Sequence, residues 1–221
     1  MYVYIEFFLL NVIIFKVISL IKNIVFDMGG VLIDLDLQRT LNEYFKPEYH
    51  QDILEKVFYS DEWRQMDAGT LRSDDAIPMI LPKFPEELRP LLGEMINNFY
   101  PYMPPLTYME DFIIRLKKAG YKTYLLSNAS PRFFDVYQNY PAICQLDGFF
   151  ISALYKLIKP QPEIYEAFCK KFDVKPEECF FIDDMKANIE VAKAYGMQGF
   201  VFDTKDLSGL EKKLNALGVI F

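Results

Sequence analysis

The fold of this chain is decided by Asn23-Ile-Val-Phe-Asp-Met-Gly-Gly-Val-Leu-Ile-Asp-Leu-Asp36, where an apolar run ends in a carboxylate and a glycine pair. Ile24, Val25 and Phe26 predict a short buried strand. The glycines after Asp27 allow the backbone to turn sharply and to approach a ligand closely. Because ligands bind beyond the carboxyl ends of strands in open α/β sheets, this stretch predicts a binding site as well as a strand.

Three further segments place polar groups where a strand or a loop ends. Tyr121-Lys-Thr-Tyr-Leu-Leu-Ser-Asn128 predicts a strand that finishes in a hydroxyl, and Leu157-Ile-Lys-Pro160 places a lysine on a loop before a helix. Cys179-Phe-Phe-Ile-Asp-Asp184 predicts a strand that finishes in two carboxylates. Strands that alternate with helices build a parallel sheet with helices on both faces. We therefore expect these polar groups to meet at one edge of a single sheet.

These motifs occur in the order found in the haloacid dehalogenase superfamily, which the chain resembles over about residues 23 to 203. The four superfamily motifs are matched by Asp27, Ser127, Lys159 and Asp183-Asp184. The string Phe-Asp-Met-Gly-Gly-Val-Leu-Ile-Asp is similar to that of sugar-phosphate phosphatases related to the bacterial α-glucose-1-phosphate phosphatase and to the amino-terminal domain of epoxide hydrolases. The resemblance implies an α/β fold, with a Rossmann-like parallel-sheet core and an inserted helical cap.

The resemblance also implies roles for individual residues. Asp27 is expected to be the nucleophile that takes the phosphoryl group as an aspartyl phosphate, which water then hydrolyses. Lys159 is expected to neutralise transition-state charge and to restrain Asp27. Ser127 and the backbone amides after Asp27, including that of Gly30, are expected to bind the phosphoryl oxygens, with Asn128 reaching the same region.

A magnesium ion is the cofactor that the resemblance implies. Its expected ligands are Asp27, the backbone carbonyl of Gly29, Asp183 and Asp184, which are the hard oxygen ligands that Mg²⁺ prefers. Two adjacent carboxylates facing Asp27 would repel one another without a cation. The expected partner is a small phosphorylated metabolite.

The segment between the first two motifs, about residues 37 to 105, predicts a helical cap. The core is expected in residues 22–36 and 106–221, and four prolines are expected to separate the cap helices: Pro78, Pro82, Pro85 and Pro90. An insertion after the nucleophile loop is placed to act as a lid over small substrates. Trp63 and Asp67 flank a turn at Gly69 and are candidates to face the cleft, although packing inside the cap is an equal alternative for Trp63.

The chain departs from the superfamily pattern at Gly29. Most of its phosphatases carry a second Asp two residues after the nucleophile, which protonates the leaving oxygen and then activates water. Loss of such a group typically costs about 10²- to 10⁴-fold in rate. Water, Asp67 or Asp34 are the candidates to replace it, and Asp34 is better explained as a turn residue.

Composition narrows the function further. The chain has 221 residues, of which 52% are hydrophobic, and a net charge of −7, so the positive field that duplex nucleic acid requires is absent. Three cysteines without Cys-x-x-Cys spacing indicate neither a disulfide framework nor a zinc site, which fits a reducing cytoplasm. A single histidine, His50, leaves Ser-His-Asp catalysis and multi-histidine metal chemistry without their parts.

Residues 1–21 form an almost wholly apolar extension whose length could span a bilayer. Glu6, Asn11 and Lys16 interrupt it, and a charge near the centre of a span costs about 2.5 to 3.5 kcal/mol on insertion scales. Three interpretations stay open: a non-native extension from an early start codon, membrane association, which is possible but not favoured, and packing on the domain.

The leading hypothesis is a Mg²⁺-dependent phosphatase of small phosphomonoesters, with sugar phosphates as the expected class. The first alternative is a haloacid dehalogenase-type hydrolase, which also lacks the second Asp but needs no metal, so the Asp183-Asp184 pair argues against it. The second alternative is a catalytically weak protein that binds a phosphorylated metabolite, for which Gly29 is the main support.

Overall fold

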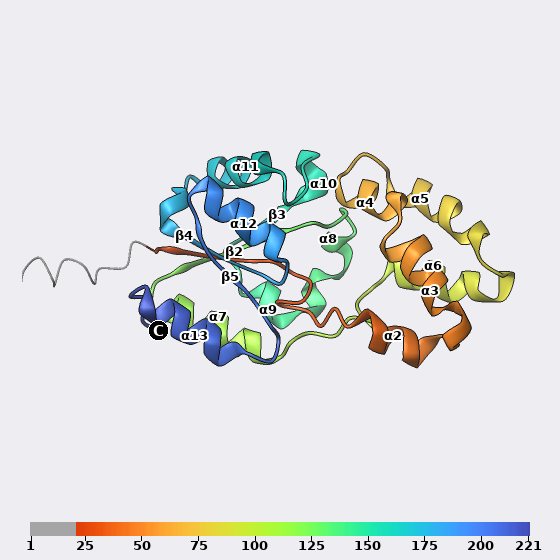
Figure 1. Ribbon diagram of the computed structural model, residues 1–221, viewed down its shortest axis with the longest axis horizontal. Helices are drawn as coiled ribbons and strands as arrows, with labels where there is room; N and C mark the ends of the chain where they lie inside the picture. The colour runs from red at the N-terminus through yellow and green to blue at the C-terminus, as the bar shows by residue number, and fades with distance from the viewer. Residues whose placement is uncertain (1–20) are drawn as a thin grey trace, which may run out of the picture.

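The computed structural model describes residues 21–221, and Figure 1 shows a sheet flanked by helices next to a separate helical layer. The five strands pair in the order β3-β2-β1-β4-β5, and every pair is parallel. The strands are β1 (Asn23–Phe26), β2 (Lys122–Ser127), β3 (Gly148–Ile151), β4 (Cys179–Asp183) and β5 (Gln198–Val201). This order places β1, the first strand of the described residues, at the centre of the sheet.

Helices cover both faces of the sheet, as a parallel sheet requires. In Figure 1, α11 and α12 lie above it and α7 and α13 lie below it. The core helices are α7 (Tyr108–Lys118), α8 (Phe133–Val136), α9 (Pro141–Cys144), α10 (Ser152–Tyr155), α11 (Pro162–Phe172), α12 (Lys186–Tyr195) and α13 (Leu207–Ala216). Short 3₁₀ turns η6 (Tyr137–Asn139) and η7 (Pro176–Glu178) lie between them.

Alternation along the strands explains how both faces are filled. In β1, Ile24 and Phe26 join the apolar cluster between the sheet and helices α7 and α13. Val25 joins the cluster between the sheet and helices α11 and α12. Successive side chains of a strand point to opposite faces, so an unbroken apolar run is what a strand covered on both sides needs. The expected α/β fold with a Rossmann-like parallel sheet is confirmed.

The helices between β1 and α7 form a layer of their own, here called the cap (residues 37–97), which lies to the right in Figure 1. It consists of α2 (Leu37–Tyr44), η2 (Pro47–Tyr49), α3 (His50–Ile53), the π-helical turn η3 (Leu54–Phe58), α4 (Asp61–Asp67), α5 (Ser73–Ile80), η4 (Leu81–Lys83), η5 (Glu86–Leu88) and α6 (Arg89–Asn97). Apolar side chains from these helices bury one another in a separate cluster that includes Leu41, Ile53, Met66, Ile80 and Leu92.

One proline does not act as expected. Pro78 was expected to separate cap helices, but it lies inside α5. It sits on the exposed side of that helix, while Ala76 and Ile80 are buried on the other side. A proline at that position forfeits one backbone hydrogen bond. Burial of the apolar face therefore holds the helix together across the missing bond.

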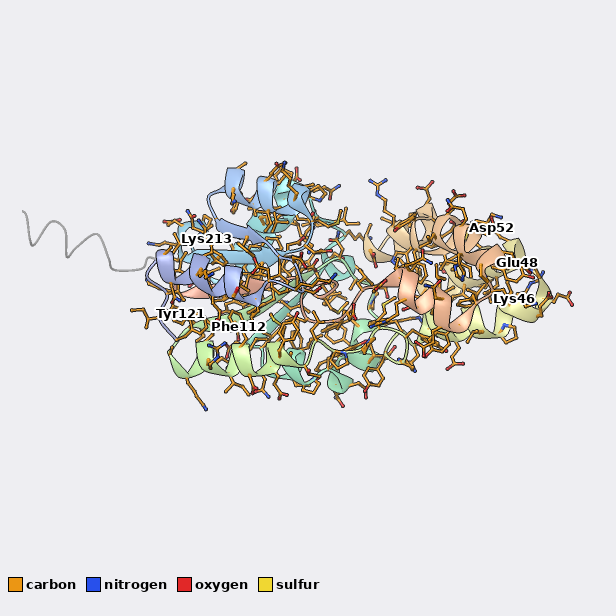
Figure 2. All side chains as sticks on the ribbon, turned by 60° about the horizontal axis from the view of Figure 1, so that its bottom comes forward. Lys46, Glu48, Asp52, Phe112, Tyr121 and Lys213 are labelled. Atoms are coloured by element: carbon orange, nitrogen blue, oxygen red, sulfur yellow. The ribbon has the colours of Figure 1, made fainter. Side chains whose placement is uncertain are left out.

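The chain passes between core and cap through two segments that lie side by side. The Asp34 amide donates to the Pro104 carbonyl at 2.8 Å, and the Leu106 amide donates to the Leu32 carbonyl at 3.0 Å. In Figure 2 the labelled cap residues and the labelled core residues lie at opposite ends of the molecule. The cap residues are Lys46, Glu48 and Asp52, and the core residues are Phe112, Tyr121 and Lys213. These paired connections leave the cap joined to the core directly above the carboxyl edge of the sheet.

Within residues 21–221, no helix has both the length and the hydropathy needed to cross a membrane. The apolar extension that ends at Ile21 lies, apart from that residue, outside the part of the chain that the structure describes.

Candidate active site

The carboxyl ends of the three middle strands bring the acidic and hydroxyl groups together. Asp27 follows β1, Ser127 ends β2, and Asp183 ends β4. The Asp27 amide donates to the Ile182 carbonyl at 2.8 Å, which ties the end of β1 to that of β4. The polar groups that follow three separate apolar runs therefore meet at one edge, as the alternation of strands and helices predicts.

Lys159 lies buried between two of these carboxylates. Its Nζ is 2.8 Å from Oδ1 of Asp27 and 2.7 Å from Oδ2 of Asp183, and its side chain is 1% exposed. Burial alone would lower the pKa of Lys159, but the two carboxylates outweigh it and raise the pKa above its usual range. The lysine therefore keeps its proton and fixes the distance between Asp27 and Asp183, which lies at the end of β4.

The loop that carries Lys159 is held by Asn128. The Lys159 amide donates to Oδ1 of Asn128 at 2.8 Å, and Nδ2 of Asn128 donates to the Lys159 carbonyl at 3.1 Å. One asparagine side chain thus pairs with both backbone groups of one residue. This arrangement uses both ends of the Asn128 amide to position the lysine beside the nucleophile candidate.

Asp183 is at the centre of a second set of hydrogen bonds. Nδ2 of Asn188 lies 2.9 Å from each of its carboxylate oxygens, and the Met185 amide donates to Oδ1 at 2.8 Å. The sequence by itself does not single out Asn188. The available signal was its place five residues after Asp183 on the first turn of a helix, but only the fold shows that its amide turns back to the carboxylate.

Three carboxylates form the group in residues 21–221 that could hold a metal ion. Asp27, Asp183 and Asp184 each offer an oxygen, and these atoms lie within 4.8 Å of one another. Burial raises the pKa of Asp27 to about 7, and the charges of Asp183 and Asp184 raise it while Lys159 lowers it. The donors are all carboxylate oxygens, which suits Mg²⁺ and does not suit a softer ion.

The two glycines after the nucleophile candidate differ in conformation. Gly30 has a positive φ of 67°, and a Cβ built on it would lie 2.7 Å from Oδ2 of Asp184. Only glycine fits there, because a side chain would displace the carboxylate. Gly29 has no positive φ, and a Cβ built on it would meet the end of the flexible Leu35 side chain at 2.9 Å. Gly30 therefore lets Asp184 approach the nucleophile loop.

A cavity of about 330 Å³ lies between the core and the cap above these groups. The core lines it with Asp27, Ser127, Asn128, Lys159 and Asp184, among others. The cap lines it mainly with apolar side chains, including Phe58, Trp63, Ile96 and the linker residue Phe99, and with the carboxylate residue Asp67. Of the two cap candidates, Trp63 packs against Phe58 with ring centroids 5.2 Å apart and also lines the cavity.

Two polar residues of the core join it to the cap beside this cavity, and the sequence by itself singles out neither. The buried Ser152 hydroxyl donates to the Asp67 carbonyl, and it accepts from the Ala129 amide at 2.9 Å. Arg132 Nη2 pairs with Oδ1 of Asp74 at 2.6 Å. Arg132 also lines the cavity, and among the described residues its buried Nε meets no hydrogen-bond partner. Ser152 and Arg132 lie in the core and their partners Asp67 and Asp74 lie in the cap, so no local sequence pattern reveals these contacts.

Comparison with protein families gives a match over residues 21–196 to the model of "haloacid dehalogenase-like hydrolase". The D-ribitol-5-phosphate phosphatase of Bacteroides thetaiotaomicron is 28% identical over 199 residues, which cover 82% of this chain and 91% of that protein. The sesquiterpene phosphatase astK of Aspergillus oryzae is 28% identical over 183 residues, which cover 80% and 88%.

A similar solved structure is that of the HAD family enzyme bt-2542 from Bacteroides thetaiotaomicron, in complex with magnesium and inorganic phosphate. Its TM-score is 0.67 at 28% identity, and the match covers 86% of this chain and 98% of that one. The crystals of that similar enzyme therefore held both a divalent cation and a phosphate ion.

Proposed function

Because this chain belongs to the haloacid dehalogenase-like hydrolases, we propose that it is a Mg²⁺-dependent phosphatase of small phosphomonoesters. The observation that carries the proposal is the buried contact of Lys159 with both Asp27 and Asp183, next to the open carboxylate of Asp184. A negatively charged ester must approach a carboxylate here, and the site offers both a fixed cation and oxygen ligands for a second one.

In this mechanism Asp27 attacks phosphorus and the ester oxygen leaves, which forms an aspartyl phosphate that water then hydrolyses. Lys159 offsets the charge on the phosphoryl oxygens and holds the Asp27 side chain at a fixed angle. The Ser127 hydroxyl and the backbone amides after Asp27, with that of Gly30 among them, hydrogen-bond the phosphoryl oxygens. Asn128 acts on the same group by fixing the lysine loop.

Asp27, Asp184 and the Gly29 carbonyl would hold the magnesium ion, with Asp183 beside them. When bound, the ion would offset the repulsion between the nucleophile and the phosphoryl oxygens. The oxygens of Asp183 already accept hydrogen bonds from Lys159, Asn188 and Met185. The main contribution of Asp183 in this proposal is therefore to orient Lys159.

Sugar and sugar-alcohol phosphates are the proposed substrate class. A relative that matches 82% of the chain acts on D-ribitol 5-phosphate, and a cavity of about 330 Å³ suits a small metabolite. Trp63 is the proposed cap contact with the substrate, because it lines the cavity opposite the strand ends. The sesquiterpene phosphatase among the relatives makes a terpenyl phosphate the comparison substrate to include.

Turnover of 4-nitrophenyl phosphate and of a sugar-phosphate panel, with Mg²⁺ and with excess chelator, tests the proposal. We expect hydrolysis that stops on chelation and returns when Mg²⁺ is restored. Release of halide from 2-chloropropionate without metal would instead establish the dehalogenase alternative. Tight binding of a phosphorylated metabolite without turnover would establish the weakly catalytic alternative, for which Gly29 is the support.

A further inference from the structure

The nucleophile loop carries no acid for the leaving group. Gly29 occupies the position two residues after Asp27, and the loop's backbone cannot protonate an alkoxide. A good leaving group such as a nitrophenolate departs without a proton, but an alkoxide from a sugar alcohol does not. If the chain hydrolyses such esters, a proton donor must reach the cavity from elsewhere.

The cavity offers a short list of titratable side chains within residues 21–221: Asp27, Tyr59, Asp67, Arg132, Lys159 and Asp184. Asp27 is the nucleophile, and Asp184 belongs to the metal group. Lys159 is held protonated between two carboxylates, and an arginine does not release its proton. Tyr59 is 73% exposed, at the outer rim. Asp67 is the remaining candidate for the proton donor, and it has no other role in the proposed mechanism.

The other carboxylate that the sequence offered is committed elsewhere. Oδ2 of Asp34 pairs with Nη1 of Arg39 at 2.6 Å, and Asp34 is not among the cavity-lining residues. It therefore belongs to the connection between core and cap rather than to the site.

Asp67 is held over the strand ends by contacts that cross from cap to core. It is the last residue of α4, and its carbonyl accepts from the Ser152 hydroxyl, which in turn accepts from the Ala129 amide. Ala129 lies two residues after Ser127, so one hydroxyl ties the cap acid to the loop that binds phosphate. Gly69, with a positive φ of 67°, packs so closely on Ala153 that a side chain there would collide with its carbonyl.

The surroundings of the Asp67 carboxyl favour its neutral form. Burial, and after it the charge of Asp27, raise the pKa of Asp67 to about 8. Hydrogen bonds from the Trp63 side chain and the Ser130 backbone, and the charge of Lys159, act in the opposite direction. Arg132 and Asp184 also face the cavity. A carboxyl that is neutral near pH 7 is a proton donor.

We propose that Asp67 is the general acid that protonates the leaving oxygen, in place of the carboxylate that Gly29 lacks. This assignment rests on the proposed phosphatase function. As the bond between phosphorus and the ester oxygen breaks and the bond to Asp27 forms, the Asp67 proton moves to the departing oxygen and leaves a carboxylate. Water then attacks phosphorus, gives its proton to that carboxylate, and releases inorganic phosphate and free Asp27.

The test is the dependence of kcat/KM on the leaving group in Asp67→Asn. This parameter reports the steps up to alcohol release and is insensitive to the later attack of water. We expect kcat/KM to fall about 10²- to 10⁴-fold for D-ribitol 5-phosphate and by less than about tenfold for 2,4-dinitrophenyl phosphate, with phenyl phosphate between them. Asp67→Ala is the second variant, and the loss of kcat/KM should rank the three esters in the same order.

Asp61→Asn is the matched control, because it makes the same change at an exposed position on the same helix. It should leave all three esters unchanged. Gly29→Asp in the Asp67→Asn background should restore part of the activity on D-ribitol 5-phosphate, since the nearest atom to a Cβ on Gly29 is the movable end of the Leu35 side chain.

An equal loss on all three esters, or no loss on any, would overturn the assignment of Asp67 as the acid while leaving the phosphatase function in place. A wild-type protein that hydrolyses none of them in Mg²⁺ would overturn the proposed function, and the acid assignment with it.

Discussion

The two walls of the cavity are built in opposite ways. The core wall presents charged groups that are buried and cross-linked, as in the contacts of Lys159 with Asp27 and Asp183. The cap wall presents mostly apolar side chains such as Phe58 and Trp63, together with Asp67, whose backbone carbonyl accepts from the core hydroxyl of Ser152. Cross-linked charge lies on one side of the cavity, and a mostly apolar surface lies on the other.

This difference assigns different tasks to the two regions. Phosphoryl transfer needs donors and cations at fixed positions, and the ends of adjacent parallel strands supply them with little freedom to move. Recognition of the leaving group needs only a surface of suitable shape and a proton. Variants of the core wall should therefore affect every phosphate ester alike, whereas variants of the cap wall should separate one ester from another.

The largest effect is expected for Asp27→Asn, which should abolish turnover of every ester because a neutral amide does not form the acyl phosphate. The pKa of Asp27 is raised from 3.8 to about 7 on folding, so the folded chain binds this proton more tightly than the unfolded chain. Its contribution to stability is therefore full at low pH and is lost as pH rises toward 7.

Asp27→Asn should remove this loss and unfold at no lower temperature than the wild type at pH 8 in chelator. Steady-state rates and thermal unfolding measure the two effects. A variant that keeps a substantial fraction of the wild-type rate would break the assignment of the core wall.

The next effect is expected for Lys159→Met. Removing one charged group from the transition state should lower kcat/KM by about 10²- to 10³-fold on aryl and alkyl esters alike. Loss of the cation also leaves the buried Asp27 and Asp183 without a cationic partner, which should lower the free energy of unfolding by about 3 to 5 kcal/mol. Urea denaturation measures this, with the exposed Lys170→Met as the control.

A smaller effect is expected for Asp184→Ala, which should raise the Mg²⁺ concentration needed for half-maximal activity more than it changes the preference among esters. Because protons and Mg²⁺ compete for Asp27, the apparent Mg²⁺ affinity of the wild type should rise from about pH 6 to about pH 8. Titration calorimetry at the two pH values measures this change. An affinity that falls with pH would contradict the proposed ligand set.

The smallest effect is expected at the junction of the two walls. Ser152→Ala removes the hydroxyl that joins the Asp67 carbonyl to the Ala129 amide, and it should cost about 1 to 3 kcal/mol of stability. Loosening the cap acid should slow alkyl esters by up to about 10²-fold and aryl esters less. Ser208→Ala, an exposed serine of α13, is the control. Equal slowing of both ester types would show that the junction supports the core wall instead.

The sequence by itself determined where the strand-end groups of the core wall meet. Asp27, Ser127 and Asp183 each end or directly follow an apolar run, and parallel strands bring such positions to one edge whatever the details of packing. The alternation of strands and helices was therefore enough to place Asp27, Ser127 and Asp183 together. It was also enough to predict the helical character of the cap, although not the helix that continues through Pro78.

Only the tertiary structure decided what faces that wall. Sequence offered both Asp34 and Asp67 as candidates, although it favoured a turn role for Asp34. The fold pairs Asp34 with Arg39 and places Asp67 in the lining of the cavity. The contact that places Asp67 joins it to Ser152, 85 residues away. Contacts of that kind depend on how a cap helix docks on the core, and no periodicity within either segment contains that information.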